Sequence, residues 1–287
     1  MLARLSLVAL AAAASSLAQE IPATASPEQL ALVNAQYQNS GLNDGGNAGF
    51  GIELNSAALL SIVYGFGVVE NGQTYSVDQV AEAPDVYVTP ASDTAAEFNS
   101  SAAYTLMLAD ASSLGDPDTR GNYRHFLGNG FTGAAASGSN LTFQPENGEV
   151  ITSYAAPGPI AGTGPHRYAW LMFTQPGDFA APANLSSPGT AAAPWYVSSY
   201  VQETGLQLVA ASFFTVQNGE PTGSVASTQA VNTATLSVSS AASSTSSGAS
   251  ASASAPASGG NDSSAAPKSI VASVAAGLLG LGAALMA

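Results

Sequence analysis

The sequence contains no cysteine, and its 287 residues include only five lysines and arginines against 19 acidic residues. Without cysteine the chain has no disulfide, no zinc–thiolate centre and no thiol nucleophile. Cysteine usage therefore does not indicate the redox compartment of the protein. The formal net charge of −14 argues against a nucleic-acid partner, because such partners are bound through cations that neutralise phosphates. The G-x-S-x-G and H-E-x-x-H motifs are also absent, so the standard hydrolase and zincin signatures are missing.

The two ends of the chain carry apolar segments. The first, MLARLSLVALAAAASSLAQE, has Arg4, then an apolar run and a small-residue site, which predicts a secretory signal peptide over residues 1–18. Near the other end, small residues at Gly260 and Asn261 are followed by a polar spacer and an uncharged apolar tail with no basic residue after it. This order predicts a removed glycosylphosphatidylinositol (GPI) anchor signal over 261–287, attached at Gly260 or Asn261; the alternative is a tail-anchored helix.

Residues 221–260 are rich in Ser, Ala and Thr. Such a segment has too little apolar bulk to offset the entropy of ordering, so we predict a disordered, O-glycosylated stalk. Sequons at Asn99, Asn140 and Asn184 suit a secreted glycoprotein. We therefore expect a folded domain over 19–220, displayed at the cell surface of a fungus in the plasma membrane or cell wall.

Short runs rich in β-branched and aromatic residues dominate the predicted domain. Ser26 before Pro27 predicts the start of a helix, and APWYVSSYVQETGL predicts a second helix that ends near Gly205. We expect a mostly β fold, an antiparallel sandwich or barrel with a few peripheral helices. The predicted strands are FGIELN, LLSIVYGF, DVYVTP, AYTLMLA, RHFLGNGF, RYAWLMFTQ and QLVAASFFTVQ.

The positive charge of the predicted mature chain gathers in one stretch, whereas its acidic residues are spread along the domain. Such clustering focuses a positive field on an otherwise negative surface. The loop GPIAGTG, which is separated from His166 by a single proline, has glycines that let a backbone approach a ligand closely. An anion site is therefore expected here. The clustered residues are Arg120, Arg124, His125, His166 and Arg167.

Asp110 ends the strand-like run AYTLMLAD. A carboxylate near two imidazoles orients them and raises their pKa, which makes them better anion donors. Read from residue types alone, Asp110, His125 and His166 leave three interpretations open. They suit an anion pocket, a metal site of two histidines and one carboxylate, or an acid/base pair.

The motifs YTLMLAD, RHFLGNGF and GPIAGTGPHRYAWLMF resemble the phosphatidylethanolamine-binding protein (PEBP) family, which includes the Raf kinase inhibitor proteins and the carboxypeptidase Y inhibitor. The loop is close to the family's G-P-P-x-G-T-G-x-H-R-Y, and YVQETGLQLVAASFFTVQ is similar to the C-terminal helix and strand of fungal members. The resemblance implies a PEBP-like antiparallel β-sandwich with a small pocket for phosphate-like anions. The pocket residues that it implies are Asp110, Tyr123, His125, Gly158, Pro159, His166, Arg167 and Tyr168.

The sequence departs from the family where D-P-D-x-P is usual. It reads DASSL there, so Ser112 and Leu114 replace the second aspartate and the proline. A DPD at residues 116–118 lies too close to His125, and we assign Asp110 as the pocket aspartate. Arg167, whose usual partner is the second aspartate, is then expected to pair with Asp116 or Asp118, or to contact the ligand.

The leading expectation is a binding protein for an anionic lipid head group or a small phosphate-like ligand, held at a membrane through a lipid anchor. We expect no cofactor, no metal and no catalytic role. The alternative is a serine carboxypeptidase inhibitor, a class that resembles this family but works largely through an N-terminal segment; an Asp/His proton-transfer enzyme is the third reading. Trp170 and Phe173 are expected in the core, and Trp195 on the last helix.

Overall fold

The computed structural model describes residues 21–45, 49–99, 101–116, 120–135, 141–143 and 147–226, together with residues 228, 231 and 236. The predicted signal peptide, most of the predicted stalk, the GPI segment with Gly260 and Asn261, and the sequon at Asn140 lie outside these residues. In the described part of the chain, no helix is long and apolar enough to cross a membrane.

The described strands form two sheets. The first contains β1 (Ala58–Tyr64), β2 (Gly67–Val68), β4 (Asp85–Pro90), β7 (Ala134–Ala135) and β8 (Leu141–Phe143), in the order β2-β1-β4-β8-β7. The second contains β3 (Thr74–Tyr75), β5 (Tyr104–Ser113), β6 (Asn122–Phe131), β9 (Glu149–Thr152), β10 (His166–Thr174), β11 (Ala193–Trp195) and β12 (Gln207–Val216), in the order β11-β6-β5-β10-β12-β3 with β9 beside β6. Each described pair of strands is antiparallel except β12 and β3. The predicted mostly β, antiparallel architecture is confirmed.

The strands of the second sheet bury side chains on both faces. Leu106 and Leu108 of β5 pack in the core shared with the first sheet, and the intervening Met107 packs in a second core on the helical side. Successive side chains of a strand point to opposite faces, so β10 divides in the same way, with Trp170 in the first core and Leu171 in the second. Whether a residue number is odd or even therefore decides the face of each site residue on these strands, except at a bulge.

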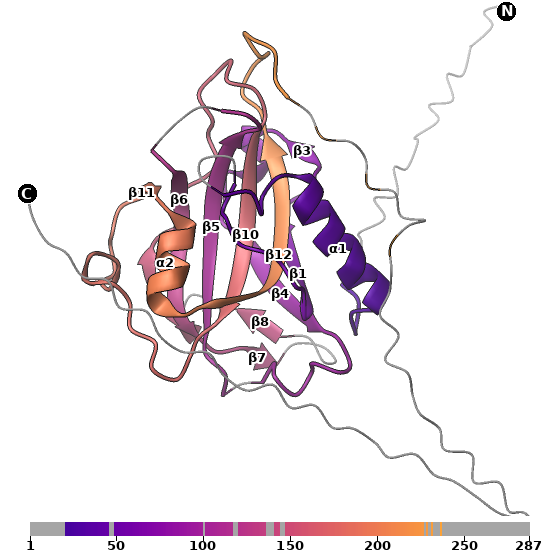
Figure 1. The fold of residues 1–287 in the computed structure, drawn as a ribbon, viewed down its shortest axis with the longest axis vertical. Helices are drawn as coiled ribbons and strands as arrows, with labels where there is room; N and C mark the ends of the chain where they lie inside the picture. The colour runs from indigo at the N-terminus through magenta and orange to yellow at the C-terminus, as the bar shows by residue number, and fades with distance from the viewer. Residues whose placement is uncertain are drawn as a thin grey trace, which may run out of the picture. The chain divides into compact units, whose positions relative to one another are not determined.

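Helices α1 (Pro27–Asn39) and α2 (Val197–Thr204) cover the second sheet on its outer face. Figure 1 shows β6, β5, β10 and β12 side by side, with α2 in front of them and β1 and β4 behind. Ser26 caps α1 in a capping box with Gln29, and Gly205 ends α2 in the left-handed conformation at φ 69°, as residues of these types do. Both predicted helices are present, but the second begins at Val197, because the predicted first turn, Ala193–Trp195, forms the strand β11.

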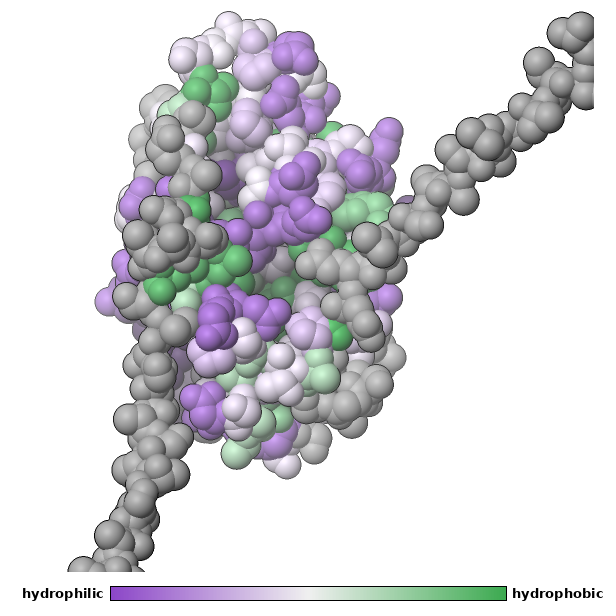
Figure 2. Space-filling view, turned by 90° about the vertical axis from the view of Figure 1, so that its right-hand side faces the viewer, coloured by the Kyte–Doolittle hydropathy of each residue, from purple (hydrophilic) through white to green (hydrophobic). Residues whose placement is uncertain are grey.

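The outer surface on the side of α1 is mixed in character. Figure 2 shows hydrophilic and hydrophobic residues interspersed over this face. Val33 and Tyr37 are the buried residues of α1, and the ring of Tyr37 meets that of Phe213 edge to face at 6.1 Å between centroids. The helix is therefore attached by a few apolar side chains, and its exposed polar residues are Glu28, Gln29 and Gln38.

Two local predictions were wrong. The run FGIELN forms no strand, because Phe50 and Gly51 donate to carbonyls of the loop after α1 (Leu42 and Asp44) and Gly51 has φ 67°. Trp195 lies on β11 rather than on the second helix. It is nevertheless buried in the core on the helical side. Trp170 and Phe173 are buried as predicted.

Candidate anion-binding site

Two β-bulges shape the end of the second sheet where the predicted site residues lie. On β6, Phe126 pairs with Leu108 and Arg124 with Ala109, so His125 is an extra residue between them. On β5, Asp110 pairs with Tyr168 and Ser113 with His166, so two residues of β5 face one of β10. Bulges re-aim side chains and often stand beside functional sites. The bulge on β6 explains how His125 and Phe126, adjacent in sequence, both contact residues of the first core.

A cavity of about 410 Å³ opens at this end of the sheet. It gathers residues from β5, β6, β10 and β11 and from the loop of residues 153–165, which connects β9 to β10. Seven of the eight predicted pocket residues line it, which are Asp110, Tyr123, His125, Gly158, Pro159, His166 and Tyr168. The cavity also contacts Ser112, Arg120, Gly121, Asn122, Ala155, Ala156, Ile160, Ala192 and Pro194.

His166 is held by protein groups on both ring nitrogens. Its Nδ1 lies 3.0 Å from Oδ2 of Asp110, and its Nε2 lies 2.8 Å from Oγ1 of Thr163. The second carboxylate oxygen of Asp110 accepts from the backbone N–H of Ser112 at 2.6 Å. Because the carboxylate accepts, Nδ1 of His166 is the donor in this pair. Asp110 therefore fixes the orientation of the His166 ring at the edge of the cavity.

His125 also lies beside Tyr168. The ring of Tyr168 lies 5.2 Å from that of His125 and 6.5 Å from that of His166, measured between centroids. Nδ1 of His125 donates to the carbonyl oxygen of Ala155 at 2.8 Å. Burial lowers the pKa of His125, an effect opposed in part by this hydrogen bond and by Asp110. A neutral His125 thus keeps its proton on Nδ1 and carries a lone pair on Nε2.

The segment that follows β12 supports the loop of residues 153–165. Asn218 donates through Nδ2 to the carbonyl of Pro159 at 3.1 Å, and its own carbonyl accepts from the N–H of Gly162 at 3.0 Å. Thr222 donates through its N–H to the carbonyl of Gly162 at 2.9 Å. A Cβ on Gly164, which has φ 86°, would lie 2.6 Å from a methyl carbon of Val225. Contacts with this loop therefore extend beyond residue 220, the predicted end of the domain.

The mouth of the cavity carries exposed apolar side chains. Ile160 is 72% exposed and Tyr123 is 39% exposed, and both line the cavity. Tyr123 is anchored through its hydroxyl, which donates to the carbonyl of Ala192 at 3.3 Å. Tyrosine and isoleucine at one opening offer an apolar surface beside the polar interior, which suits a ligand with both kinds of group.

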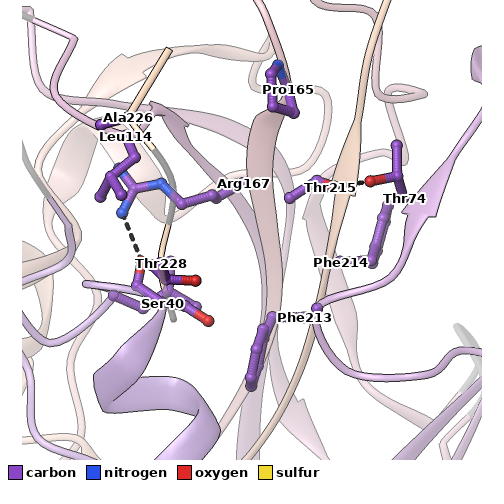
Figure 3. A pocket seen from close by; sticks show the side chains of 12 residues that line it. Ser40, Thr74, Leu114, Pro165, Arg167, Phe213, Phe214, Thr215, Ala226 and Thr228 are labelled. Carbon is purple, nitrogen blue, oxygen red and sulfur yellow. Dashed lines mark hydrogen bonds between the residues drawn. The ribbon is translucent and has the colours of Figure 1, made fainter. Parts of the chain in front are cut away.

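Arg167 was predicted in the pocket, but it faces away from the cavity. It follows His166 on β10, and adjacent strand residues point to opposite faces. Its guanidinium donates to the carbonyls of Ser40 (2.9 Å), Ala111 (2.7 Å) and Ser112 (3.2 Å). Figure 3 shows Arg167 reaching toward Ser40 and Leu114 in a different cavity, of about 260 Å³. Arg167 thus ties the bulge of β5 to the end of α1, and burial lowers its pKa to about 10.

Asp116, one of the two suggested partners of Arg167, accepts a hydrogen bond from the Ser112 hydroxyl at 2.7 Å. It also helps to keep the pKa of Arg167 from falling further, together with Asp110 and Asp44. Asp118 and Pro117 lie outside the described residues. Ser112 adopts φ 60°, a left-handed conformation uncommon for a side-chain-bearing residue. Ser112 therefore forms the turn that follows Asp110, with its N–H bonded to Asp110 and its hydroxyl bonded to Asp116.

The other two arginines of the cluster separate in space. Arg124 is buried, donates to Thr152 Oγ1 at 2.8 Å and to the Ala191 carbonyl at 2.9 Å, and lies over the ring of Trp195 at 5.1 Å. Arg120 is exposed and lines the cavity with the histidines. The sequence placed Arg120 in the cationic cluster without assigning it to the pocket. Its spacing of five residues before His125, across a turn at Gly121, was the available signal.

The sequons within the described residues are accessible. Asn99 and Asn184 are both exposed. The Asn99 side chain accepts from the N–H groups of Ser101 and Ala102 at 2.9 and 3.1 Å. Within the same described ranges, no group of three His, Cys, Asp or Glu side chains is arranged to hold a metal ion.

The chain is similar to several solved structures, one of which supports the same fold with a TM-score above 0.5. The carboxypeptidase Y inhibitor, in a crystal structure of its complex with the cognate proteinase, is 21% identical with a TM-score of 0.51, over 64% of this chain and 93% of that chain. A phosphatidylethanolamine-binding protein from Plasmodium vivax is 14% identical with a TM-score of 0.44, over 64% and 96% of the two chains. E. coli YbcL, described as a member of the mammalian PEBP family, is 10% identical with a TM-score of 0.37, over 56% and 99%.

The family model of the phosphatidylethanolamine-binding proteins matches residues 65–214. The matched range is more than half of the 287 residues and contains each of the residues Asp110, His125 and His166. It also includes the two bulged strands and the loop before β10. The chain therefore belongs to the phosphatidylethanolamine-binding protein family.

Proposed function

We propose that this protein is an extracellular, surface-anchored binding protein whose cavity holds a phosphate-bearing head group, from a phospholipid or a small organic phosphate. The observation that carries the proposal is the convergence of Asp110, His125, His166 and Arg120 on one cavity of about 410 Å³. Imidazolium and guanidinium groups are good donors to phosphate oxygens. The apolar mouth at Tyr123 and Ile160 suits an ester whose phosphate enters first and whose apolar part stays outside.

Most polar groups of the cavity are engaged with other protein groups, which suits a binding role. Asp110 is engaged by His166 and by the N–H of Ser112, and Nε2 of His166 is engaged by Thr163. A general base needs a proton acceptor within reach of the reacting group. In this cavity the candidate that meets this condition is Nε2 of His125, whose ring orientation is fixed by Ala155. We therefore assign the site to binding and keep proton transfer as the outcome that a turnover assay would reveal.

The first prediction is that head-group affinity rises as the pH falls. Burial lowers the pKa of His125, so Nε2 carries no proton near pH 8 and an anion binds there only when a proton is taken up. The charged groups that face His125 are Asp110, which favours its protonation, and His166, which opposes it. We expect the affinity for glycerophosphoethanolamine to rise by up to about tenfold per pH unit between about pH 8 and pH 6.

Titration calorimetry in two buffers of different ionisation enthalpy measures both the affinity and the proton uptake. A phosphodiester is the right probe, because its phosphate does not itself titrate in this range. The variant His125→Gln is the matched control, and its affinity should change much less with pH. A wild-type affinity that is flat across the range, with no proton uptake, would contradict this assignment of His125.

The carboxypeptidase Y inhibitor is the neighbour with a TM-score of 0.51, and this likeness favours carboxypeptidase inhibition as a second candidate function. Inhibitors of that class act largely through an N-terminal segment, and residues 1–20 lie outside those that the structure describes. Inhibition of a serine carboxypeptidase by the mature chain, retained when the cavity residues are replaced, would support this second function over the first.

We also propose that the chain is secreted and held at the surface by a GPI anchor attached near Gly260 or Asn261. The predicted signal peptide over 1–18, the Ser/Ala/Thr-rich stalk and the uncharged apolar tail support this location. The second prediction is that phosphatidylinositol-specific phospholipase C releases the protein from intact cells. A variant that ends at residue 260 should instead appear in the medium, and a full-length chain that resists the phospholipase would favour the tail-anchored helix.

A further inference from the structure

Both histidines of the cavity are bonded to the same loop, the one of residues 153–165. The carbonyl oxygen of Ala155 accepts from Nδ1 of His125 at 2.8 Å, and Oγ1 of Thr163 lies 2.8 Å from Nε2 of His166. Three further residues of this loop line the cavity, which are Gly158, Pro159 and Ile160. The position of the loop therefore sets the orientation of both imidazole rings and the shape of the cavity wall.

The two halves of this loop are anchored to different parts of the molecule. In the first half, the N–H of Ala155 donates to the carbonyl of His125 in β6 at 2.8 Å. The second half contacts residues 218–226, which follow β12 and which we call the strap. In Figure 1 the strap belongs to the orange loop above β12. The chain after the last strand therefore returns to the cavity instead of leaving the domain at once.

The strap holds the peptide groups of Gly162 on both sides. The N–H of Gly162 donates to the carbonyl of Asn218 at 3.0 Å. The carbonyl of Gly162 accepts from the N–H of Thr222 at 2.9 Å and from its hydroxyl at 3.1 Å. Asn218 also donates through Nδ2 to the carbonyl of Pro159 at 3.1 Å. Asn218 and Thr222 thus fix the backbone of the loop at two places.

The strap also lies close against the two glycines that flank Thr163. A Cβ on Gly162 would lie 2.8 Å from Cγ2 of Thr222, and a Cβ on Gly164 would lie 2.6 Å from a methyl carbon of Val225. Contacts of this closeness leave no space for a side chain at either glycine. The strap therefore restrains the backbone on both sides of the residue that bonds to His166.

The end of the strap reaches the turn that follows β5. A Cβ on Gly115 would be in van der Waals contact with Cβ of Ala226, at 3.9 Å. This turn directly follows the strand that carries Asp110, and the hydroxyl of Ser113 in that strand donates to the carbonyl of Thr163 at 2.7 Å. The strap thus contacts both segments of the chain that flank the pair of Asp110 and His166.

We propose that the strap is part of the binding site, with Asn218 and Thr222 as positioning residues that hold the loop in its ligand-binding arrangement. This inference rests on the proposed function, because it assumes that the cavity takes a phosphate ester. A loop that is already held in place loses less freedom when the ligand binds, which strengthens binding. Binding and strap docking are then coupled, so the ligand must stabilise the docked strap in return.

The first test measures amide hydrogen exchange in the mature chain, stalk included, with and without saturating glycerophosphoethanolamine at about pH 6. We expect the ligand to slow exchange of the N–H groups of Gly162 and Thr222 by about fivefold or more, because exchange requires the strap to leave the loop. A strap with a structural role alone would exchange at the same rate in both samples. This measurement needs no variant and so does not depend on the stability of one.

The second test measures affinity by titration calorimetry. The double variant Asn218→Ala with Thr222→Val removes two side-chain hydrogen bonds to the loop, and we expect its affinity to fall by about fivefold to tenfold. Thr222→Ser keeps the hydroxyl and should bind within about twofold of wild type. Ser224→Ala is the matched control, because it removes a hydroxyl from an exposed position of the same strap. Melting temperatures of the variants verify that each is folded.

The outcomes separate this inference from the proposed function. If the wild type binds the phosphodiester but exchange of the strap is unchanged by it, the positioning role is overturned and the binding function stands. The same holds if the folded double variant keeps the wild-type affinity, or if Ser224→Ala loses as much affinity as the double variant. A wild-type chain that binds no phosphate ester would overturn the proposed function itself.

Discussion

Replacing both His125 and His166 by alanine is expected to weaken binding of a phosphate head group by about 100-fold or more at about pH 5.5. At that pH His125 is able to take up the proton that its burial disfavours at neutral pH, and both imidazoles then donate to the ligand. Each hydrogen bond to a charged group contributes about 1.5–3 kcal/mol, so the loss of two accounts for the expected factor. Titration calorimetry with glycerophosphoethanolamine measures it.

A separate variant is needed to distinguish lost binding from lost stability. Removing His166 takes away the partner that Oδ2 of Asp110 has at 3.0 Å. Asp110 is buried, and a buried carboxylate that loses its partner destabilises the fold. The triple variant Asp110→Asn with both alanines avoids that unpaired charge and should bind as weakly while melting closer to wild type. If a folded double variant kept the wild-type affinity, the cavity would not be the binding site of the head group. Carboxypeptidase inhibition that persists in the same variant would support the inhibitor function, and substrate turnover that disappears would support an enzyme.

Replacing Arg167 by alanine is expected to lower the stability of the domain by about 3–5 kcal/mol. The residue is 6% exposed, and its guanidinium donates to the carbonyls of Ser40, Ala111 and Ser112, which belong to two segments far apart in the sequence. Alanine would remove the donor of these bonds and the positive charge that faces Asp116 and Asp44. For a domain of this size the change corresponds to a fall in melting temperature of about 10 °C or more.

Calorimetric or fluorescence melting of the purified domain measures this effect. Arg120→Ala is the matched control, because it removes the same side chain from an exposed position and should change stability by no more than about 0.5 kcal/mol. Arg167→Lys should fall between the two, since one ammonium cannot reach all the carbonyls that the fork contacts. If Arg167→Ala kept its stability and lost head-group affinity, the guanidinium would belong to the ligand site after all.

The two arginines lie at different cavities, which their sequence positions do not suggest. Arg167 follows His166 directly, yet it lines a different cavity. Arg120 is five residues from His125 and lines the same cavity. Proximity along a strand is a poor guide to a shared site, because neighbouring strand residues face opposite sides of the sheet.

The sequence alone determined the elements whose signals are local. Ser26 and Pro27 predicted the start of α1, Gly205 predicted the end of α2, and runs such as AYTLMLA and RYAWLMFTQ predicted β5 and β10. It also predicted that Asp110 and the two histidines would meet, because the motifs that carry them resemble one family. Capping and strand periodicity depend on a few neighbouring residues, so a single sequence contains them in full.

Only the tertiary structure decided which side chains enter the cavity. The bulge at His125 and the turn at Ser112 arise from the register between strands distant in sequence, and this register fixes the faces of His125 and Arg167. FGIELN has strand-like composition but donates to the loop after α1, which periodicity could not reveal. Long-range pairing sets register, bulges and cavity walls, and no local pattern contains that information. For this reason the sequence wrongly predicted Arg167 in the pocket and did not assign Arg120, which lines it.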